Sequence, residues 1–373
     1  MERNTTYIGL DVSKQTIAVA VAENGRRGEV RFYGTISSKP EAVAKLVKTL
    51  AAAHGMLAFA YEAGPTGYGL YRQLTQLGHI CQVVAPSMTP ARPGNQIKTD
   101  RRDAVVLASL FRAGELTSIW VPDTEHEAMR DLIRARIAAV EAVRRTRQQL
   151  LSFLLRHGRI YKDGIKHWSK RHRRWLGDQR FDHPAQQIAF EEYNRAIEQA
   201  EDRRLRLERQ IEAQLPNWSL HPVVAAIQAL RGVSLIAAVT IIAEVGDFRR
   251  FANPRQLMGW LGLVPRERSS GSTRAQGNIT KAGNTRARRM LVESAWSYRL
   301  PARVAGDLLR RSASLPETVR DIAWKAQVRL CARYRRMQRS GRPKNVVTVA
   351  IARELAAFAW AIAIQTPAAV KAA

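Results

Sequence analysis

Short apolar runs alternate with helical patterns over the first 112 residues, and each run ends at turn residues. Apolar runs of this length predict strands, whereas apolar residues at helical spacing predict helices. The expected order is strand–strand–strand–helix–strand–helix–strand–helix. The predicted elements are two strands within 6–22 around a turn at Ser13–Gln15, a strand at 29–37, a helix at 40–53, a strand at 57–62, a helix ending near Gly78, a strand at 80–85 and a helix from about Asp100 to Arg112.

This order is typical of a ribonuclease-H-like, or RuvC-like, α/β domain, which we expect to span residues 1–122. In that architecture the first strand lies at the centre of the sheet and the fourth strand lies beside it. The ends of these two strands and a late helix can then converge on one point. Residues at those three places are therefore the first candidates for chemistry.

The pattern changes from Glu125 to about Gln214, where apolar residues follow helical spacing along two long segments. We expect a helical, coiled-coil-like spacer over residues 123–220. The apolar stripe of the second helix is interrupted by Arg204, which argues against a long regular coiled coil.

A basic stretch at 156–175 separates the two helices, and its arginines and lysines alternate with Tyr161, Trp168 and Trp175. Cations interleaved with aromatic rings can follow and stack on a nucleic-acid strand. A solvated basic face explains the same residues equally well. The basic candidates for nucleic-acid contact here are Lys166, Arg171, Arg173 and Arg174.

Residues 221–373 are expected to form an all-α domain. Turns at Gly232 and Gly246 between apolar helices suggest a helix–hairpin–helix-like element, in which backbone N–H groups grip phosphate. A buried helical hairpin explains these glycines nearly as well. The segment 266–284 is rich in Ser, Gly and Arg and is expected to be a polar loop.

Charge changes this picture from a generic two- or three-domain protein to a polyanion-binding one. The 373 residues include 60 Lys+Arg and 32 Asp+Glu, a formal charge of +28. Such an imbalance points first to nucleic acid and second to an anionic membrane surface. The two cysteines, Cys81 and Cys331, indicate a reducing compartment without a disulfide framework or zinc site.

The N-terminus has no apolar signal region, and the apolar stretches 235–243 and 355–364 are too short to span a bilayer. We therefore expect a cytoplasmic protein associated with nucleic acid, with no membrane partner.

Four carboxylates stand where a magnesium site would need them. Asp11 and Glu62 each close a predicted buried strand, and Asp100 and Asp103 share one face of a helix. Mg²⁺ prefers carboxylate oxygens and keeps several waters, so three or four acids suffice to assist phosphoryl transfer. The alternative is that Asp11 and Glu62 cap turns and that Asp100 caps its helix.

Three serines, Ser269, Ser270 and Ser272, flank Gly271 in the polar segment. A serine hydroxyl can attack a phosphodiester if its proton is removed and cations hold the phosphate oxygens. Such cations are at hand in Arg274, Lys281 and Arg286. A flexible surface loop is the competing interpretation of the serines.

The residues together resemble a known family, the DEDD-type insertion-sequence transposases, which are RNA-guided recombinases. The N-terminal signature is carried by YIGLDVSK, YEAGPTG and KTDRRDA. The C-terminal signature is carried by LRGVSLIAAVTIIAEVGDF, FANPRQLMGWLGLVPRE and SSGSTRAQGNITKAGNTRARRML. The resemblance covers about residues 6–120 and 225–300.

The resemblance implies that the acidic quartet is Asp11, Glu62, Asp100 and Asp103 and that the nucleophile is Ser270, which precedes the glycine. It also implies Mg²⁺, double-stranded donor and target DNA, a guide non-coding RNA, and a dimer that forms a tetramer of two dimers through the helical segment. The resemblance thus implies a bacterial, nucleoid-associated transposase that exchanges DNA strands.

Two rival functions stay open. One is a Mg²⁺-dependent junction nuclease that uses water and no protein nucleophile. The other is a non-enzymatic RNA-binding protein that keeps the fold.

Overall fold

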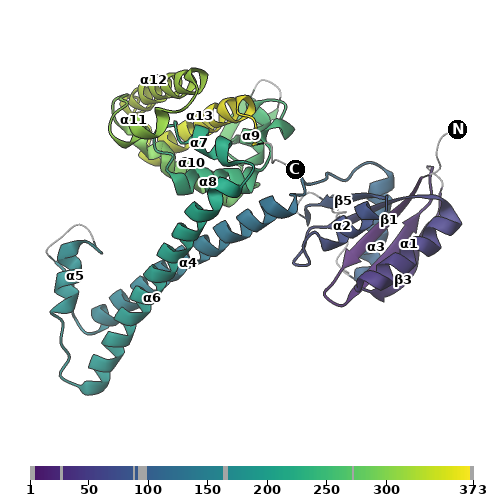
Figure 1. The fold of residues 1–373 in the computed structure, drawn as a ribbon, viewed down its shortest axis with the longest axis horizontal. Helices are drawn as coiled ribbons and strands as arrows, with labels where there is room; N and C mark the ends of the chain where they lie inside the picture. Colours follow the sequence, from purple (N-terminus) through teal and green to yellow (C-terminus); the bar gives the residue numbers. More distant parts are fainter. Residues whose placement is uncertain are drawn as a thin grey trace. The chain divides into compact units, whose positions relative to one another are not determined.

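The structure is a computed structural model that describes residues 5–25, 28–86, 89–90, 99–162, 167–270 and 273–369. It divides into two compact units, residues 1–121 and 122–373, and each is described by itself (Figure 1). The domain boundaries expected at 122/123 and 220/221 remain predictions, since the second unit joins the helical spacer and the C-terminal region.

A five-stranded sheet forms the centre of the first unit, in the order β3-β2-β1-β4-β5. Antiparallel pairs join β1 to β2 and β2 to β3, whereas β4 runs parallel to both β1 and β5. The predicted central position of the first strand and the neighbouring position of the fourth are both present. The strands are β1 (Thr5–Val12), β2 (Thr16–Ala22), β3 (Val30–Ser37), β4 (Met56–Glu62) and β5 (Ile80–Val84).

The two faces of the sheet differ in side-chain size. Helices α1 (Pro40–His54) and α2 (Gly69–Gln76) pack on the face that carries large aliphatic and aromatic residues. Helix α3 (Asp100–Arg112) packs on the other face, where Ala18, Ala20 and Ala22 of β2 leave room for a close approach. The sequence therefore determines which helix can lie closest to the strands.

Two long helices dominate the start of the second unit. Helix α4 (Thr124–Arg156) packs against α6 (Pro184–Gln214), and the short α5 (Lys170–Gly177) lies in the connection between them (Figure 1). Arg204 does not open a gap in this pair, because its Nη1 donates to Glu208 Oε2 at 2.7 Å. Arg136 of α4 donates to the other oxygen of Glu208 through Nε at 2.9 Å. An ion pair thus replaces the missing apolar contact.

The aromatic residues of the basic stretch face inward. Tyr161 is buried, and Trp168 and Trp175 pack against an apolar cluster built from Phe153, Leu176 and neighbouring residues of α4 and α6. The rings therefore stabilise the end of the helical pair, which favours the solvated basic face over strand stacking by these aromatics.

A compact, mainly helical body completes the second unit, with its core formed along α8, α10, α12 and α13. The helices, η denoting 3-10 turns, are η2 (Leu215–Asn217), α7 (His221–Ile227), α8 (Leu235–Val245), η3 (Phe248–Arg250), α9 (Pro254–Trp260), α10 (Thr285–Ala295), η4 (Trp296–Arg299), α11 (Asp307–Ser312), α12 (Glu317–Arg339) and α13 (Lys344–Gln365).

The expected helix–hairpin–helix-like element corresponds to α7, its following turn and α8. Gly232 lies in that turn with φ of 80°, and a Cβ built on it would meet the carbonyl oxygen of Ser294 at 2.4 Å. The glycine thus permits close packing of the turn on α10. Phosphate binding by this element remains a prediction.

The all-α expectation for residues 221–373 is wrong, because the polar segment forms a two-stranded antiparallel hairpin. Its strands are β6 (Pro265–Ser270) and β7 (Thr273–Ile279). The residues of β6 after Pro265 are all exposed, so no face is apolar and the strand leaves no alternating pattern in the sequence.

Helix α13 is the one helix in the described part of the chain that is long and apolar enough to span a membrane. Half of its most apolar window is buried. Val347, Ile351 and Leu355 are fully buried in the core of the second unit, so these apolar residues of α13 pack inside the protein.

Candidate functional site

Two candidate carboxylates lie at the ends of neighbouring parallel strands. The register pairs Leu10 of β1 with Tyr61 of β4, so Asp11 and Glu62 each follow one position later. Because side chains alternate along a strand, Asp11 shares a face with Gly9, and Glu62 shares it with Ala60. That face is the one covered by α3.

Helix α3 carries the other two candidates at its start. Thr99 is the N-cap, and its hydroxyl accepts from the backbone N–H of Arg102 at 3.3 Å. The alternative that Asp100 caps the helix is therefore wrong; Asp100 is exposed in the first turn, and Asp103 is half-buried one turn further on.

The turn-capping alternative for the strand residues, Asp11 and Glu62, stays open. The β1–β2 turn is closed by Ser13, whose hydroxyl donates to the carbonyl oxygen of Thr16 at 2.8 Å. Glu62 Oε1 accepts from Thr89 Oγ1 at 2.9 Å, a contact that brings a distant loop residue to the strand end.

Asp11 and Glu62 lie on the sheet face that α3 covers, and α3 carries Asp100 and Asp103, but the four carboxylates do not form a closed ligand set. Among the residues that the structure describes, no group of three or more His, Cys, Asp or Glu side chains is close enough to hold a metal ion. The chemistry of the donors, all carboxylates, fits a hard cation such as Mg²⁺. The four carboxylates therefore fit Mg²⁺ by the type of their donor atoms and by the strand register that aligns Asp11 with Glu62.

Ser269 and Ser270 occupy opposite faces at the end of β6. Ser269 Oγ donates to Glu267 Oε1 at 2.9 Å, so this hydroxyl already has a partner on its own face. Ser270 alternates to the other face, which it shares with Arg268. Both serines are exposed, Ser272 lies outside the described residues, and Arg274 pairs with Ser269 across the hairpin backbone.

The base of the hairpin is held by two glycines in close contact with backbone. A Cβ on Gly262 would meet the carbonyl oxygen of Ala282 at 2.0 Å, and a Cβ on Gly283 would meet that of Trp260 at 1.9 Å. Lys281 has φ of 57° and its N–H donates to the carbonyl oxygen of Gly262 at 3.1 Å. Both ends of the hairpin are thus anchored to the turn after α9.

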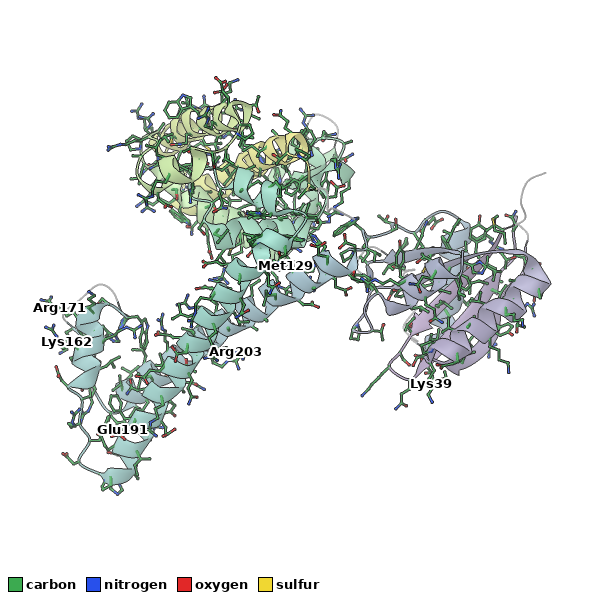
Figure 2. The ribbon with its side chains drawn as sticks, in the orientation of Figure 1. Lys39, Met129, Lys162, Arg171, Glu191 and Arg203 are labelled. Carbon is green, nitrogen blue, oxygen red and sulfur yellow. The ribbon has the colours of Figure 1, made fainter. Side chains whose placement is uncertain are left out.

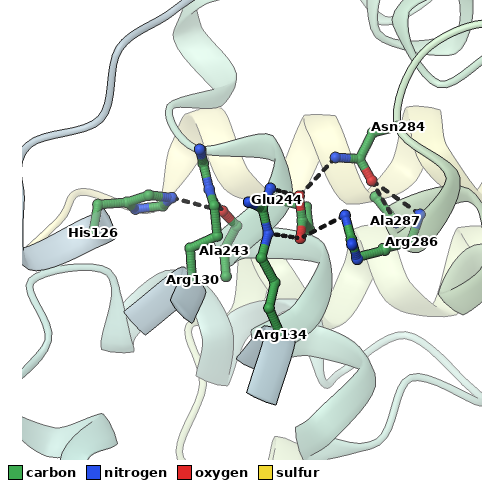
Figure 3. Close-up of polar contacts among 8 residues, drawn as sticks. All are labelled: His126, Arg130, Arg134, Ala243, Glu244, Asn284, Arg286 and Ala287. Atoms are coloured by element: carbon green, nitrogen blue, oxygen red, sulfur yellow. Dashed lines mark hydrogen bonds and ion pairs between the residues drawn. The ribbon is translucent and has the colours of Figure 1, made fainter. Parts of the chain in front are cut away.

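A buried carboxylate, Glu244 of α8, connects three elements near that anchor (Figure 3). Arg134 of α4 donates to both of its oxygens at 3.0 and 3.1 Å. Asn284 Nδ2 donates to Oε2 at 2.7 Å, while Asn284 Oδ1 caps α10. Arg286 Nη1 lies 4.0 Å from Oε1. Glu244 therefore fixes the segment that leads from the hairpin into α10.

The neighbours of Glu244 decide its charge. Burial alone would raise the pKa of this carboxyl, but hydrogen bonds from Arg134 and Asn284 and the charge of Arg286 outweigh that effect and lower the pKa. Glu244 was not among the functional residues predicted from the sequence. Its signal was a single carboxylate inside the otherwise apolar helix LIAAVTIIAEV.

The same helix receives two further contacts from α4. His126 Nε2 lies 2.8 Å from the carbonyl oxygen of Ala243, and Arg130 Nε donates to that oxygen at 3.0 Å. Burial lowers the pKa of His126, although its contact with Ala243 acts in the opposite direction. α4 is thus fixed to the helix that carries Glu244.

The basic candidates divide into paired and exposed residues. Arg173 donates to both oxygens of Glu201 at 3.0 Å, so its charge is used inside the molecule. Arg171 and Arg174 are exposed on α5, and Figure 2 labels Arg171 beside Lys162 at the far end of the helical pair. Lys166 lies outside the described residues.

Known proteins resemble the chain in both units. The pattern of the Transposase IS116/IS110/IS902 family matches residues 224–304, and that of a DEDD transposase family of the IS110 type matches residues 8–158. A Sinorhizobium fredii protein named "Putative transposase y4qE" is 54% identical over 96% of this chain and 88% of its own length. The transposase for insertion sequence element IS1533 from Leptospira borgpetersenii is 30% identical over 90% of this chain and 97% of its own.

Proposed function

Since the chain belongs to the IS110 family of DEDD transposases and is a DNA transposase, we propose that Ser270 is the group that attacks the DNA. We further propose that Asp11, Glu62, Asp100 and Asp103 hold Mg²⁺. The observation that carries the proposal is the register that sets Asp11 and Glu62 on one face at neighbouring strand ends, under the helix that bears the aspartate pair.

Bound Mg²⁺ would supply charge stabilisation at the phosphate oxygens. The protein's part is to orient these carboxylates, and the close contact between Gly9 and α3 supports that role. If the four carboxylates close on one point, they would repel one another without a cation, and bound Mg²⁺ would remove that penalty.

In the proposed step, Ser270 Oγ forms a bond to phosphorus while the bond from phosphorus to the 3′ oxygen breaks. The serine hydroxyl loses its proton and the 3′ oxygen gains one. The products are a phosphoserine that keeps the 5′ end and a free 3′-OH. A 3′-OH of the other DNA then attacks the phosphoserine, which restores the serine and completes the exchange.

Two features favour Ser270 over its neighbours. Its hydroxyl lies on the face of β6 opposite the Ser269–Glu267 hydrogen bond, and it shares that face with Arg268. The second feature is Lys281 at the base of the hairpin, a cation for the phosphate; Arg274, whose backbone pairs with that of Ser269, is proposed as a further phosphate contact. Arg286 would contribute from the start of α10.

The partners are part of the proposal. Double-stranded donor and target DNA and a guide non-coding RNA fit the charge of +28 and the exposed arginines of α5. We propose a homo-oligomer, a dimer that forms a tetramer of two dimers, through the spacer 123–220. The protein would act in the cytoplasm, at the nucleoid.

The test is covalent trapping. Wild-type protein is incubated with end-labelled DNA and Mg²⁺, the reaction is denatured, and label that remains with the protein is measured. We expect an adduct with wild type and with Ser269→Ala, and none with Ser270→Ala. Asp11→Ala should also give no adduct while DNA binding persists.

Three results would contradict the proposal. An undiminished adduct in Ser270→Ala would move the attacking group to Ser269 or Ser272. Efficient cleavage without any adduct in wild type would favour a nuclease that uses water. If the Asp11→Ala variant functions in the cell as well as the wild-type protein does, the non-enzymatic RNA-binding alternative is favoured.

A further inference from the structure

A groove of about 410 Å³ lies beside the hairpin, between β7 and the start of α13. One wall is formed by Gly277, Asn278 and Ile279 of β7, and the other by Asn345, Val346 and Val349 of α13. Lys281 and Arg353 also line the groove. None of these residues has a role in the chemistry proposed above except Lys281.

The groove is large enough and chemically suited to a flat polar ring with a charged group attached. Pockets that bind small ligands usually begin at about 300 Å³ and combine apolar walls with a few polar groups. Here the walls are aliphatic, and the polar groups are the two amides of Asn278 and Asn345. Asparagine amides pair with the edges of nucleic-acid bases.

The positive charge that lines the groove favours a phosphate. Glu354, the acid next to Arg353, already accepts from Arg329 at 2.8 Å and from Arg333 at 3.0 Å. Within the described part of the chain, neither Lys281 nor Arg353 has an acidic side chain within ion-pair distance. The groove therefore presents two uncompensated cations beside apolar walls.

We propose that this groove receives one unpaired nucleotide of a nucleic-acid strand bound at the hairpin. The base would lie between Ile279 and Val346, its edge would meet Asn278 and Asn345, and its phosphate would meet Lys281 and Arg353. The inference rests on the proposed function for its location, because Gly277 and Thr273 are four residues apart on β7, about 13 Å at strand spacing. A strand that reaches Ser270 can thus reach the groove.

The experiment measures binding in EDTA, so that no cleavage is involved. Full-length protein is titrated with a short fluorescent DNA duplex and with the same duplex carrying one bulged 2-aminopurine. A parallel pair of RNA duplexes tests whether the nucleotide belongs to DNA or RNA. We expect the bulged duplex, either of DNA or of RNA, to bind about fivefold more tightly or better than its perfect counterpart, the scale of one good amide–base pair.

Val346→Trp should fill the groove and remove that preference while leaving binding of the perfect duplex unchanged. Val328→Trp on α12 is the matched control, because both valines are 47% exposed and Val328 does not line the groove. Arg353→Gln should reduce binding of the bulged duplex more than Arg336→Gln does, although each removes one arginine.

A preference that survives in Val346→Trp would overturn the inference, as would wild-type protein that binds bulged and perfect duplexes equally in both DNA and RNA. The outcome is independent of the covalent-trapping test. Ser270→Ala should keep the preference for the bulged duplex. Failure of the covalent adduct can therefore be distinguished from failure of nucleotide binding in the groove.

Discussion

Gly9 of β1 and Ala104 of α3 are in such close contact that a Cβ on the glycine would meet the carbonyl oxygen of the alanine at 2.4 Å. The backbone N of Ala108 would lie at the same distance. Helix and strand therefore touch backbone to backbone. Asp11 follows Gly9 by two residues and Asp103 immediately precedes Ala104, so this contact sets the relation between two of the proposed metal ligands.

Gly9→Ala should accordingly impair both stability and cleavage. The added methyl group must push α3 away from β1, and overpacking of this kind costs about 1–3 kcal/mol. The measurements are denaturant unfolding and DNA strand cleavage by the purified chain. Gly69→Ala is the control, because a Cβ at Gly69 meets nothing within 4 Å. Equal behaviour of the two variants would show that α3 need not lie so close.

Asp103 should matter as much as Asp100. The two residues are three positions apart at the start of α3, which puts them on one face of the helix. Asp100→Asn and Asp103→Asn should each lower cleavage by about a hundredfold or more, on the scale of losing an electrostatic contribution to catalysis. Rates at saturating Mg²⁺ provide the comparison. Full activity in Asp103→Asn beside an inactive Asp100→Asn would mean that the pair is not a shared metal platform.

Glu244→Gln should destabilise the protein at neutral pH and much less in acid. The lowered pKa of Glu244 means that its stabilising contribution is complete above the ordinary value of 4.5 and is lost as pH falls through the folded-state pKa. At pH 7 we expect the substitution to lower the free energy of unfolding by about 3 kcal/mol at most, because the partial exposure of Arg134 weakens the ion pair. Denaturant unfolding at stepped pH measures the difference.

The control for that series is Glu293→Gln, which removes an exposed carboxylate paired with Arg289 four residues away. Such a surface pair contributes little, so its removal should have almost no effect at any pH. A difference between wild type and Glu244→Gln that stays constant from neutral to acid pH would show that the charge of Glu244 is not what holds Asn284.

Replacing Arg171 and Arg174 together by Gln should weaken nucleic-acid binding and reduce its salt dependence. Each phosphate contact contributes about −0.9 to the slope of log K against log salt, so the slope should change by about 2 units. Fluorescence anisotropy over a salt series measures it. The double variant Arg144→Gln with Arg195→Gln removes two exposed arginines that already pair with Glu141 and Glu192. An equal change in both double variants would count against a specific role for α5.

Much of the N-terminal unit was predictable because its signals are local. The strand ending in Glu62 is a continuous apolar run, and the helix from Asp100 to Arg112 has clear helical spacing, so both lie where the sequence placed them. The sheet order followed from the sequence of elements. Register then brought Asp11 and Glu62 to one edge, as a ribonuclease-H-like fold requires.

The misses have physical reasons as well. The hairpin of β6 and β7 is exposed on both faces, so pairing of the backbone, and not burial, defines it. Arg204 looked like a defect in the apolar stripe because its partner Glu208 and the cross-helix Arg136 are recognised only in three dimensions. Whether the four carboxylates close around Mg²⁺ depends on side-chain geometry that strand and helix patterns do not encode.

The arginine pairs of the second unit have a consequence for how this protein meets a polyanion. Glu208, Glu201 and Glu354 each accept from two arginines. One carboxylate can cancel only one of those charges, so every such junction joins at least two helices and still leaves one positive charge uncompensated. These three acids hold helices of the second unit together. They do not cancel the positive electrostatic field that an approaching nucleic acid meets.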